Sequence, residues 1–373
     1  MQMSADWYHS PSARAWVDDS PAAPAGQFHR SMPGYAPTAL HDLPHLAQEL
    51  GVASVRVKDE SARLGLPAFK ILGASWACAN VVAERTGTAP DDLPSLRRSA
   101  EGRSIEFVTA TDGNHGRAVA RMAALFGLTS TVFVPATMTP AAAEAIAAEG
   151  GSVHRSPGDY DQAVTEAAQY ADRGGERALV QDTAWEGYEQ VPAWIVQGYE
   201  TLLAEIDQAL PDPPDLVVVP VGVGSLAQAV VSHYRRGPGS RPSALLAVEP
   251  RTAACALASL TTGEPVTVPI EGSVMAGLNC GTVSAGAWPV LRDGLDGAIT
   301  VGDEQALRAA EDLNRAGVSS GPSGAATLAG LRAALTVPAR REALGVTGAS
   351  TVVLLNTEGR RETSPPAGTP ARP

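Results

Sequence analysis

Lys70 stands in an apolar run, Ala-Phe-Lys-Ile-Leu-Gly-Ala-Ser at residues 68–75. Burial in such surroundings lowers the pKa of an amine and favours its neutral form. A neutral buried lysine is the nucleophile that condenses with the aldehyde group of a cofactor. A lysine flanked by apolar residues also commonly extends its charged end to water. The segment by itself is therefore compatible with a catalytic lysine and with a surface lysine.

A second segment contains side chains that could bind a ligand or take part in catalysis. It is Thr-Ala-Thr-Asp-Gly-Asn-His-Gly at residues 109–116, between a predicted strand and a predicted helix. In open α/β sheets, ligands bind at the carboxyl ends of the strands, and a helix N-terminus favours anions. Asp112 supplies a carboxylate and Asn114 a neutral donor and acceptor. Because Asp and Asn also cap helices, the segment alone predicts either a cap or a binding site.

Two further loops follow predicted strands. Residues 221–226, Val-Gly-Val-Gly-Ser-Leu, open a helix, so their backbone amides and the Ser225 hydroxyl are placed to bind a phosphate. The loop lacks the Gly-Lys-Ser/Thr of a P-loop and the third glycine of a dinucleotide fingerprint. Residues 181–188, Gln-Asp-Thr-Ala-Trp-Glu-Gly-Tyr, place Asp182 beside aromatic residues. This pattern is also typical of a capped loop that packs its aromatic side chains.

The elements that must position these loops alternate along the chain. Strands are predicted at residues 54–57, 105–110, 131–135, 152–155, 178–181, 216–219, 244–248 and 351–355. Helices are predicted at 75–85, 116–126, 140–149, 160–171, 191–209, 227–234, 252–260, 306–316 and 324–335. This alternation predicts an α/β fold with two open, mostly parallel sheets flanked by helices. Residues 1–34 are predicted to be an irregular arm, and residues 360–373 a mobile tail.

Composition excludes several classes of function. The 373 residues are 44% hydrophobic and 18% charged, which suits a soluble globular protein. A net charge of -12 without a basic cluster argues against nucleic acid and membrane partners. The chain has no long apolar run and no secretory signal pattern, so a cytoplasmic location is expected. Cys78, Cys255 and Cys280 lack Cys-x-x-Cys spacing, and the seven histidines include no His-Glu-x-x-His, so no metal site is predicted.

The joint order of these features carries more information than any one of them. A lysine, an Asn-His-Gly loop, a glycine-rich loop and a hydroxyl after the last buried strand resemble the pyridoxal-phosphate enzymes of the tryptophan synthase β-like family, fold type II. Within it, the chain is similar to the diaminopropionate ammonia-lyases. The resembling stretches are residues 28–35, 57–61, 68–75, 109–116, 181–188 and 275–281, and the similarity extends over about residues 28–359. Thr-Asp-Gly-Asn-His-Gly and Gln-Asp-Thr-Ala-Trp-Glu-Gly-Tyr are specific to that subfamily.

The resemblance implies pyridoxal 5′-phosphate as the cofactor and assigns roles to residues. Lys70 matches the Schiff-base lysine, which later acts as a base, and Asn114 matches the residue that hydrogen-bonds the cofactor's 3′-oxygen. Thr357 matches the hydroxyl partner of the pyridine nitrogen, with Asn356 as the adjacent alternative. Asp112 and Asp182 occupy the positions of two catalytic carboxylates. The phosphate loop of the family corresponds to Gly222, Val223, Gly224, Ser225 and Leu226.

The implied reaction is β-elimination of ammonia from 2,3-diaminopropionate, giving pyruvate and ammonia. Two carboxylates suit this substrate because it carries an additional β-ammonium group. The family processes both enantiomers, so we expect Lys70 to act on the L-isomer and Asp112 on the D-isomer. A serine or threonine dehydratase, a β-replacement synthase and a non-catalytic binding protein are the alternatives. Pro322-Ser323-Gly324 is closer to the dehydratases, and Arg360-Arg361-Glu362 departs from the acidic residues typical of the lyases.

The same resemblance implies a division into two domains. A large cofactor-binding domain is expected from residues 1–85 and 187–373, including an N-terminal arm at 1–27 and the tail, and a small domain from 86–186. A homodimer is expected, with a small-molecule amino acid as the substrate. Cys255 and Cys280 fall where family members can form a disulfide, whereas a reducing cytoplasm favours two free thiols.

Overall fold

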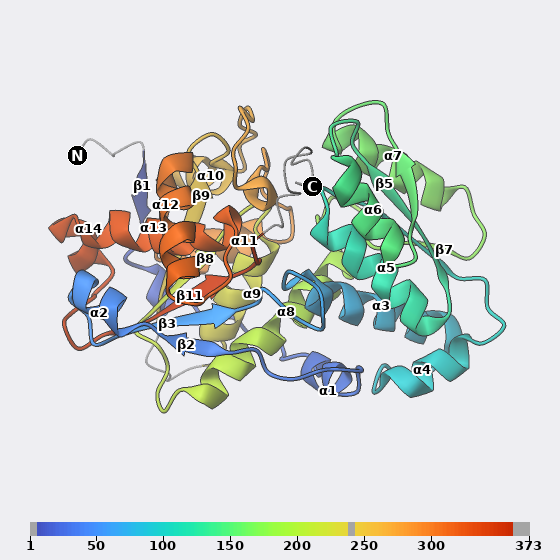
Figure 1. Ribbon diagram of the computed structural model, residues 1–373, viewed down its shortest axis with the longest axis horizontal. Coiled ribbons are helices and arrows are strands. Elements are labelled where there is room, and N and C mark those ends of the chain that lie inside the picture. Colours follow the sequence, from blue (N-terminus) through green and yellow to red (C-terminus); the bar gives the residue numbers. More distant parts are fainter. Residues whose placement is uncertain (1–5, 238–242, 361–373) are drawn as a thin grey trace, which may run out of the picture.

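Two sheets organise the chain in the computed structural model, which describes residues 6–237 and 243–360. One sheet has seven strands in the order β1-β10-β9-β8-β11-β3-β2, and the other has four in the order β6-β5-β4-β7. They form two lobes that lie side by side, the large one on the left of Figure 1 and the small one on the right. The predicted α/β class with two mostly parallel sheets is confirmed. The strands of the large sheet are β1 (Trp7–His9), β2 (Leu40–Asp42), β3 (Ser54–Asp59), β8 (Leu216–Pro220), β9 (Ala244–Pro250), β10 (Gly297–Val301) and β11 (Thr351–Asn356), and those of the small sheet are β4 (Glu106–Ala110), β5 (Thr129–Val134), β6 (Ser152–Arg155) and β7 (Arg177–Leu179).

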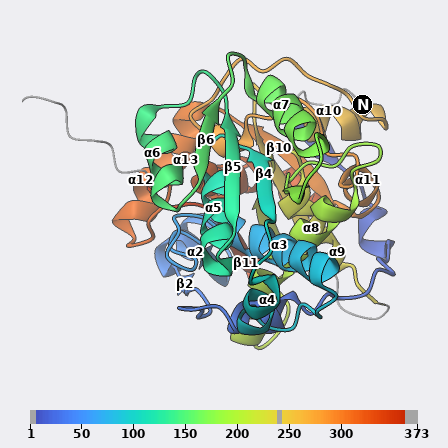
Figure 2. The same ribbon diagram turned by 90° about the vertical axis from the view of Figure 1, so that its right-hand side faces the viewer.

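Helices pack around both sheets. In Figure 2, where the small lobe faces the viewer, β6, β5 and β4 lie side by side with helices on either side of them. The helices are α1 (Ala25–Arg30), α2 (Pro44–Leu50), α3 (Lys70–Thr86), α4 (Leu93–Ala100), α5 (Asn114–Phe126), α6 (Pro140–Ala148), α7 (Tyr160–Asp172), α8 (Gln190–Ala209), α9 (Ser225–Tyr234), α10 (Cys255–Thr262), α11 (Trp288–Gly294), α12 (Asp303–Arg315), α13 (Pro322–Leu335) and α14 (Pro338–Ala343). Among the described residues, no helix is long and apolar enough to cross a membrane.

All strand pairs of the small sheet are parallel. In the large sheet, only the edge strands β1 and β2 are antiparallel to their neighbours. The central strands β8, β9 and β10 are buried along their whole length. Because parallel strands share one direction, the loops that leave their carboxyl ends meet at one edge of the sheet.

The prediction that residues 1–34 form an irregular arm is only partly correct. Strand β1 pairs with β10, and helix α1 buries Phe28 and His29. The His29 ring is within hydrogen-bonding distance of Thr201 Oγ1 (2.7 Å) and Leu72 O (3.0 Å), so α1 is attached to both α8 and α3. These partners are remote in the sequence, which is why local pattern did not reveal the two elements. Residues 361–373, most of the predicted tail, lie outside the described residues.

The structure also corrects the predicted start of helix α3. The sequence predicted this helix from residue 75, whereas it begins at Lys70 itself.

Strand β10 was not predicted at all, because Gly297 and Ala298 give its sequence no strand pattern. Its burial between β9 and β1 decides its conformation. The other predicted strands and helices occur with ends shifted by a few residues.

Helices α3 and α8 approach each other through glycine. A Cβ atom on Gly198 would lie 2.4 Å from Leu72 O, and one on Gly73 would lie 2.5 Å from the ring of Tyr199. Contacts this short do not occur with a side chain present, so both glycines are required by the helix packing. The contact lies within one turn of Lys70 and therefore determines where the lysine side chain starts.

A buried cluster of charges holds the segment that leads to Lys70. Glu205 of α8 accepts hydrogen bonds from Lys58 Nζ at 2.5 Å and from Arg63 Nη2 at 2.7 Å. Arg63 also pairs with Glu60 at 2.6 Å. Burial raises the pKa of Glu205, but the hydrogen bonds and charge of Arg63 outweigh it and hold the pKa at about 2. Breaking such a buried network by removing one partner costs about 3–5 kcal/mol, so it firmly anchors the loop before Lys70 to α8.

We expect Gly198→Ala to destabilise the protein because the new methyl group forces α3 and α8 apart. Overpacking of this kind costs about 1–3 kcal/mol. Gly348→Ala is the matched control, since nothing lies within 4 Å of a Cβ at that position. Chemical denaturation measures both variants. Equal stability of the two variants would show that α3 and α8 have room to adjust.

Candidate active site

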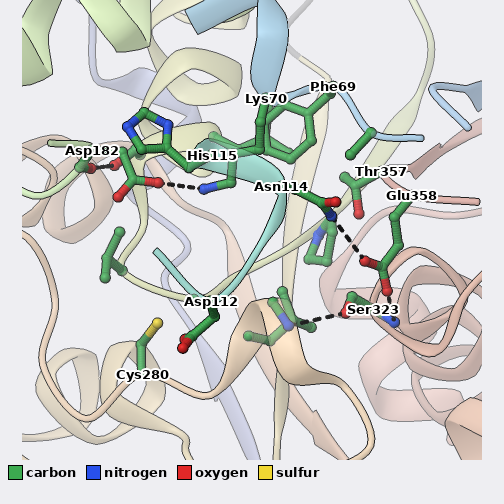
Figure 3. A pocket seen from close by; sticks show the side chains of 18 of the residues that line it. Phe69, Lys70, Asp112, Asn114, His115, Asp182, Cys280, Ser323, Thr357 and Glu358 are labelled. Atoms are coloured by element: carbon green, nitrogen blue, oxygen red, sulfur yellow. Dashed lines mark hydrogen bonds and ion pairs between the residues drawn. The ribbon is translucent and has the colours of Figure 1, made fainter. Parts of the chain in front are cut away.

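Loops from both lobes line a central pocket (Figure 3). The start of α3 contributes Lys70, the β4–α5 loop contributes Asp112 and Asn114, and the loop after β7 contributes Asp182. Residues 222–226 and Thr357 complete the wall from the large lobe. The structure thus brings every residue predicted for the site into one pocket. Among the described residues, no group of His, Cys, Asp and Glu is arranged to hold a metal ion.

Lys70 and Asp182 form an ion pair. Lys70 Nζ lies 2.5 Å from Asp182 Oδ2, and the lysine side chain is 23% exposed (Figure 3). Burial lowers the pKa of Lys70, but the adjacent carboxylate outweighs it and raises the pKa above the ordinary lysine value. Burial likewise disfavours the Asp182 carboxylate, yet Lys70 holds its pKa at about 2. The expected neutral lysine is therefore wrong for this state, because its carboxylate partner comes from a distant segment.

The β4–α5 loop is shaped by glycine and threonine. Gly113 precedes α5 with a φ of 146°, a conformation that side chains rarely adopt. Thr111 Oγ1 accepts hydrogen bonds from the amides of Gly113 and Gly116 at 2.9 and 3.0 Å. The helix-capping role is thus carried out by Thr111, and neither Asp112 nor Asn114 is the N-cap residue. Their side chains line the pocket instead.

Neighbouring side chains position the Asp182 loop. Gln181 Oε1 accepts from Ala110 N at 2.9 Å, and Gln181 Nε2 donates to the Tyr160 hydroxyl at 2.8 Å. Ser225 Oγ donates to the Asp182 carbonyl oxygen at 2.8 Å. The loop that carries Asp182 is therefore attached to the end of β4 and to the start of α9.

The glycine-rich loop has the properties of a phosphate site. A Cβ on Gly222 would lie 3.0 Å from Gly277 O and 3.1 Å from Cys280 Sγ, and Gly224 has a φ of 100°. Both positions therefore favour glycine. The first amides of α9 have no acceptor within the helix, and the helix dipole adds positive potential there. Ser225, Leu226 and the preceding loop line the pocket, so an anionic group would be bound by backbone amides.

Asn356, the last residue of β11, and the next residue, Thr357, have different surroundings. Asn356 is fully buried, donates to Asp59 Oδ1 at 3.0 Å and Ser319 O at 2.8 Å, and accepts from Ser320 Oγ at 2.6 Å. Its hydrogen-bonding groups are occupied by the fold. Thr357, in contrast, lines the pocket. The geometry supports Thr357 rather than Asn356 as the partner of a bound ring nitrogen.

Several pocket residues were not predicted as site residues: His115, Tyr160, Tyr199, Cys280, Ser323 and Glu358. His115 and Glu358 adjoin predicted residues, so their neighbours in sequence could have indicated them. Tyr199 comes from the middle of α8, and no local signal distinguishes it. Its buried hydroxyl has no hydrogen-bond partner among the described residues.

Cys255 and Cys280 both lie next to Gly222. Cys255 Sγ is 3.6 Å from Gly222 O, and Cys280 Sγ would be 3.1 Å from a Cβ at Gly222. Both thiols are free, as is Cys78. Burial raises the pKa of the Cys280 thiol to about 12, which keeps it protonated at neutral pH.

The arrangement combines an amine, two carboxylates and an anion cradle. Lys70, Asn114 and residues 222–226 line one pocket, so a flat ligand bound there would meet the amine, the amide and the anion cradle together. Asp112 and Asp182, the latter paired with Lys70, line the same pocket, where a second cationic group would find carboxylate partners. The residues therefore fit a phosphorylated aldehyde that works on a cationic amine substrate.

Known proteins resemble the chain over most of its length. The model of the family described as "Pyridoxal-phosphate dependent enzyme" matches residues 32–358. Diaminopropionate ammonia-lyase of Salmonella typhimurium is 37% identical over 290 residues, which are 74% of this chain and 71% of that protein. The crystal structure of holo diaminopropionate ammonia lyase from Escherichia coli, with selenomethionine incorporated, matches with a TM-score of 0.85 at 32% identity, covering 96% of this chain and 94% of that one. The L-threonine ammonia-lyase of Geobacter sulfurreducens is more distant, with 28% identity over 73% of this chain and 64% of that protein.

From the Lys70–Asp182 ion pair we predict that Asp182→Asn lowers the pKa of Lys70. Without the carboxylate, its charge and its hydrogen bond no longer oppose burial, so the pKa of Lys70 falls below its wild-type value. Competitive labelling with acetic anhydride across a pH series, read by mass spectrometry, measures this pKa in protein without cofactor. Asp172→Asn is the control, because Asp172 is an exposed residue at the end of α7 that does not line the pocket. An unchanged pKa in Asp182→Asn would contradict the ion pair.

Proposed function

We propose that this chain, which belongs to the pyridoxal-phosphate dependent enzyme family and within it to the diaminopropionate ammonia-lyases, eliminates ammonia from 2,3-diaminopropionate and releases pyruvate and ammonia. The observation that carries the proposal is that Lys70, Asp112 and Asp182 line one pocket together with the glycine-rich loop. A lysine and a phosphate cradle serve any enzyme of this family. The two additional carboxylates favour a substrate with a second ammonium group.

The pocket fits pyridoxal 5′-phosphate. When bound, this cofactor accepts the electron pair that remains on the substrate after its Cα proton is removed. Gly222, Val223, Gly224, Ser225 and Leu226 would hold the phosphate through backbone amides and a hydroxyl. Asn114 would donate to the 3′-oxygen, and Thr357 would face the pyridine nitrogen. Lys70 would attach the cofactor through its amine.

Asp182 would link the charge of the substrate to the protonation state of Lys70. In the structure, the carboxylate is paired with the lysine ammonium at 2.5 Å, which keeps the amine protonated. The β-ammonium of diaminopropionate would compete for this carboxylate. Once the substrate's α-amine has displaced Lys70 from the cofactor and Asp182 pairs with the β-ammonium, burial lowers the pKa of Lys70, and its neutral Nζ can take the Cα proton. Serine lacks this second cation and would leave Lys70 paired.

Asp112 is our proposed second base. It projects from the β4–α5 loop, whereas Lys70 comes from the start of α3, so the two groups enter the pocket from different elements (Figure 3). Removal of a proton from either enantiomer requires a base on each face of the substrate. We assign Lys70 to the L-isomer and Asp112 to the D-isomer.

Two alternatives retain the same fold and cofactor. A serine or threonine dehydratase would release a hydroxyl group, and the relative with that kind of substrate in its name is the more distant one. A β-replacement synthase would add a nucleophile in place of the leaving group. Neither alternative uses both Asp112 and Asp182 to bind a second ammonium. A non-catalytic binding protein would not need Lys70, Asn114 and the glycine-rich loop together in one pocket.

We also propose the wider organisation of the enzyme. Residues 86–186 would form a small domain and residues 1–85 and 187–373 a large one. The strands of the four-stranded sheet fall within residues 106–179, which supports this division. We propose a homodimer, as the family resemblance implies, and a cytoplasmic location, as expected from the sequence. Light scattering on the purified full chain measures the assembly.

Pyruvate and ammonia released from L-2,3-diaminopropionate, with L-serine in parallel, test the reaction. We expect two ammonia molecules per pyruvate from the diamino acid and much slower turnover of serine, since only the diamino acid provides a second cation for Asp182. Added thiols should not change the products. Faster turnover of serine would instead identify a dehydratase, and a thiol adduct would identify a replacement synthase.

Asp112→Asn tests the two-base assignment. The substitution keeps the size of the side chain but removes its basicity, so the ratio of D-isomer to L-isomer turnover should fall by about 100-fold or more. Solvent deuterium incorporation into each recovered enantiomer identifies the face from which the proton is removed. An unchanged ratio of turnover would show that one base serves both isomers.

A further inference from the structure

Glu358 is a buried carboxylate of the central pocket to which no catalytic or cofactor-binding role has been assigned above. It is 5% exposed and follows Thr357 after the last strand. Its Oε2 accepts from Asn114 Nδ2 at 3.4 Å, and its Oε1 accepts from Ser323 N at 3.2 Å (Figure 3). Glu358 therefore connects the large lobe to the residue that would hold the cofactor's 3′-oxygen.

The backbone around Glu358 is shaped to accept this side chain. A Cβ on Gly321 would lie 2.8 Å from Glu358 Oε1 and 2.8 Å from Gly359 O. Only glycine leaves the space that the carboxylate occupies. Ser323 stands in the first turn of α13, where its amide has no acceptor within the helix and the helix dipole favours a negative charge. These contacts hold Oε1 on the protein side and direct Oε2 toward Asn114.

The chemistry of the pair determines how the Asn114 amide is oriented. The oxygen and nitrogen ends of an asparagine side chain have nearly the same shape, so sterics alone do not choose between them. A carboxylate accepts hydrogen bonds and does not donate them. Glu358 therefore selects the NH2 end of Asn114. The amide nitrogen has a second hydrogen, which is left for the cofactor oxygen.

We propose that Glu358 is a positioning residue that orients the Asn114 amide so that its nitrogen donates to the 3′-oxygen of pyridoxal phosphate. This inference rests on the proposed role of Asn114. It extends that role because the site then needs a carboxylate beyond Asp112 and Asp182. In the wrong orientation, the carbonyl oxygen of Asn114 would face the cofactor oxygen, and two acceptors would repel each other.

Glu358→Gln separates this role from a purely structural one. The glutamine oxygen can still accept from Ser323 N, so the anchor on α13 is retained. Its NH2 group then faces Asn114 and draws the Asn114 oxygen toward itself, which reverses the amide. We expect Glu358→Gln to have a melting temperature near that of the wild type but about tenfold weaker cofactor binding, the loss typical of one hydrogen bond to a charged group. The position of the cofactor's visible absorption band should also shift.

The experiment is a double-mutant cycle on full-length protein titrated with pyridoxal phosphate. The variants are Glu358→Gln, Asn114→Ala and the double variant, each read by cofactor dissociation constant, absorption band and thermal unfolding. If Glu358 acts through Asn114, Glu358→Gln causes no further loss of affinity in the Asn114→Ala background. Equal losses in both backgrounds would overturn the proposal, as would wild-type affinity and an unshifted band in Glu358→Gln.

Wild-type protein in the same titration distinguishes this proposal from the function on which it rests. A wild-type chain that binds no pyridoxal phosphate would refute both. A wild-type chain that binds the cofactor and turns over diaminopropionate, combined with equal losses in the cycle, would refute only the role of Glu358. Glu358→Ala provides a second variant, in which both the anchor on α13 and the contact with Asn114 are removed, so stability and cofactor affinity should fall together.

Discussion

The ion pair between Lys70 and Asp182 is the interaction on which the site depends. It joins the first residue of α3 to the loop after β7, and it places a charged amine and a carboxylate 2.5 Å apart in a mostly buried pocket. Each partner stabilises the charge of the other against the cost of burial. In the proposed mechanism, the pair holds the lysine proton until the substrate's second ammonium competes for the carboxylate, which would connect the pair to substrate choice.

The surrounding structure holds Lys70 and Asp182 at the distance of an ion pair. Gly73 and Gly198 let α3 and α8 approach closely, and the cluster around Glu205 anchors the chain that leads into α3. On the other side, Gln181 and Ser225 attach the Asp182 loop to β4 and α9. Displacing either side by a few tenths of an ångström changes the Lys70–Asp182 distance. Catalytic groups held on rigid elements in this way lose little freedom on binding.

Groups that favour anions and groups that favour cations lie in different parts of the pocket wall. The helix dipole gives the start of α9 a positive potential that would favour an anionic group, and the carboxylates of Asp112, Asp182 and Glu358 line the same pocket. A diamino acid brings two ammonium groups and one carboxylate, so it complements this distribution better than serine does. In the proposed arrangement, Glu358 adds a carboxylate whose contact with Asn114 orients that amide.

The sequence alone determined the alternation of strands and helices, since apolar runs and helical periodicity are local properties. Through the family resemblance it also indicated Lys70, Asp112, Asn114, Asp182, the 222–226 loop and Thr357, because that resemblance rests on short motifs that are local in the sequence. It did not reveal β1, whose partner β10 lies at the other end of the chain, nor the charged state of Lys70, which depends on a carboxylate from a distant loop. The choice of Thr357 over Asn356 and the contact of Glu358 with Asn114 likewise required the tertiary structure. Local order follows from neighbouring residues, whereas pKa values, hydrogen-bond partners and edge strands follow from residues that only folding brings together.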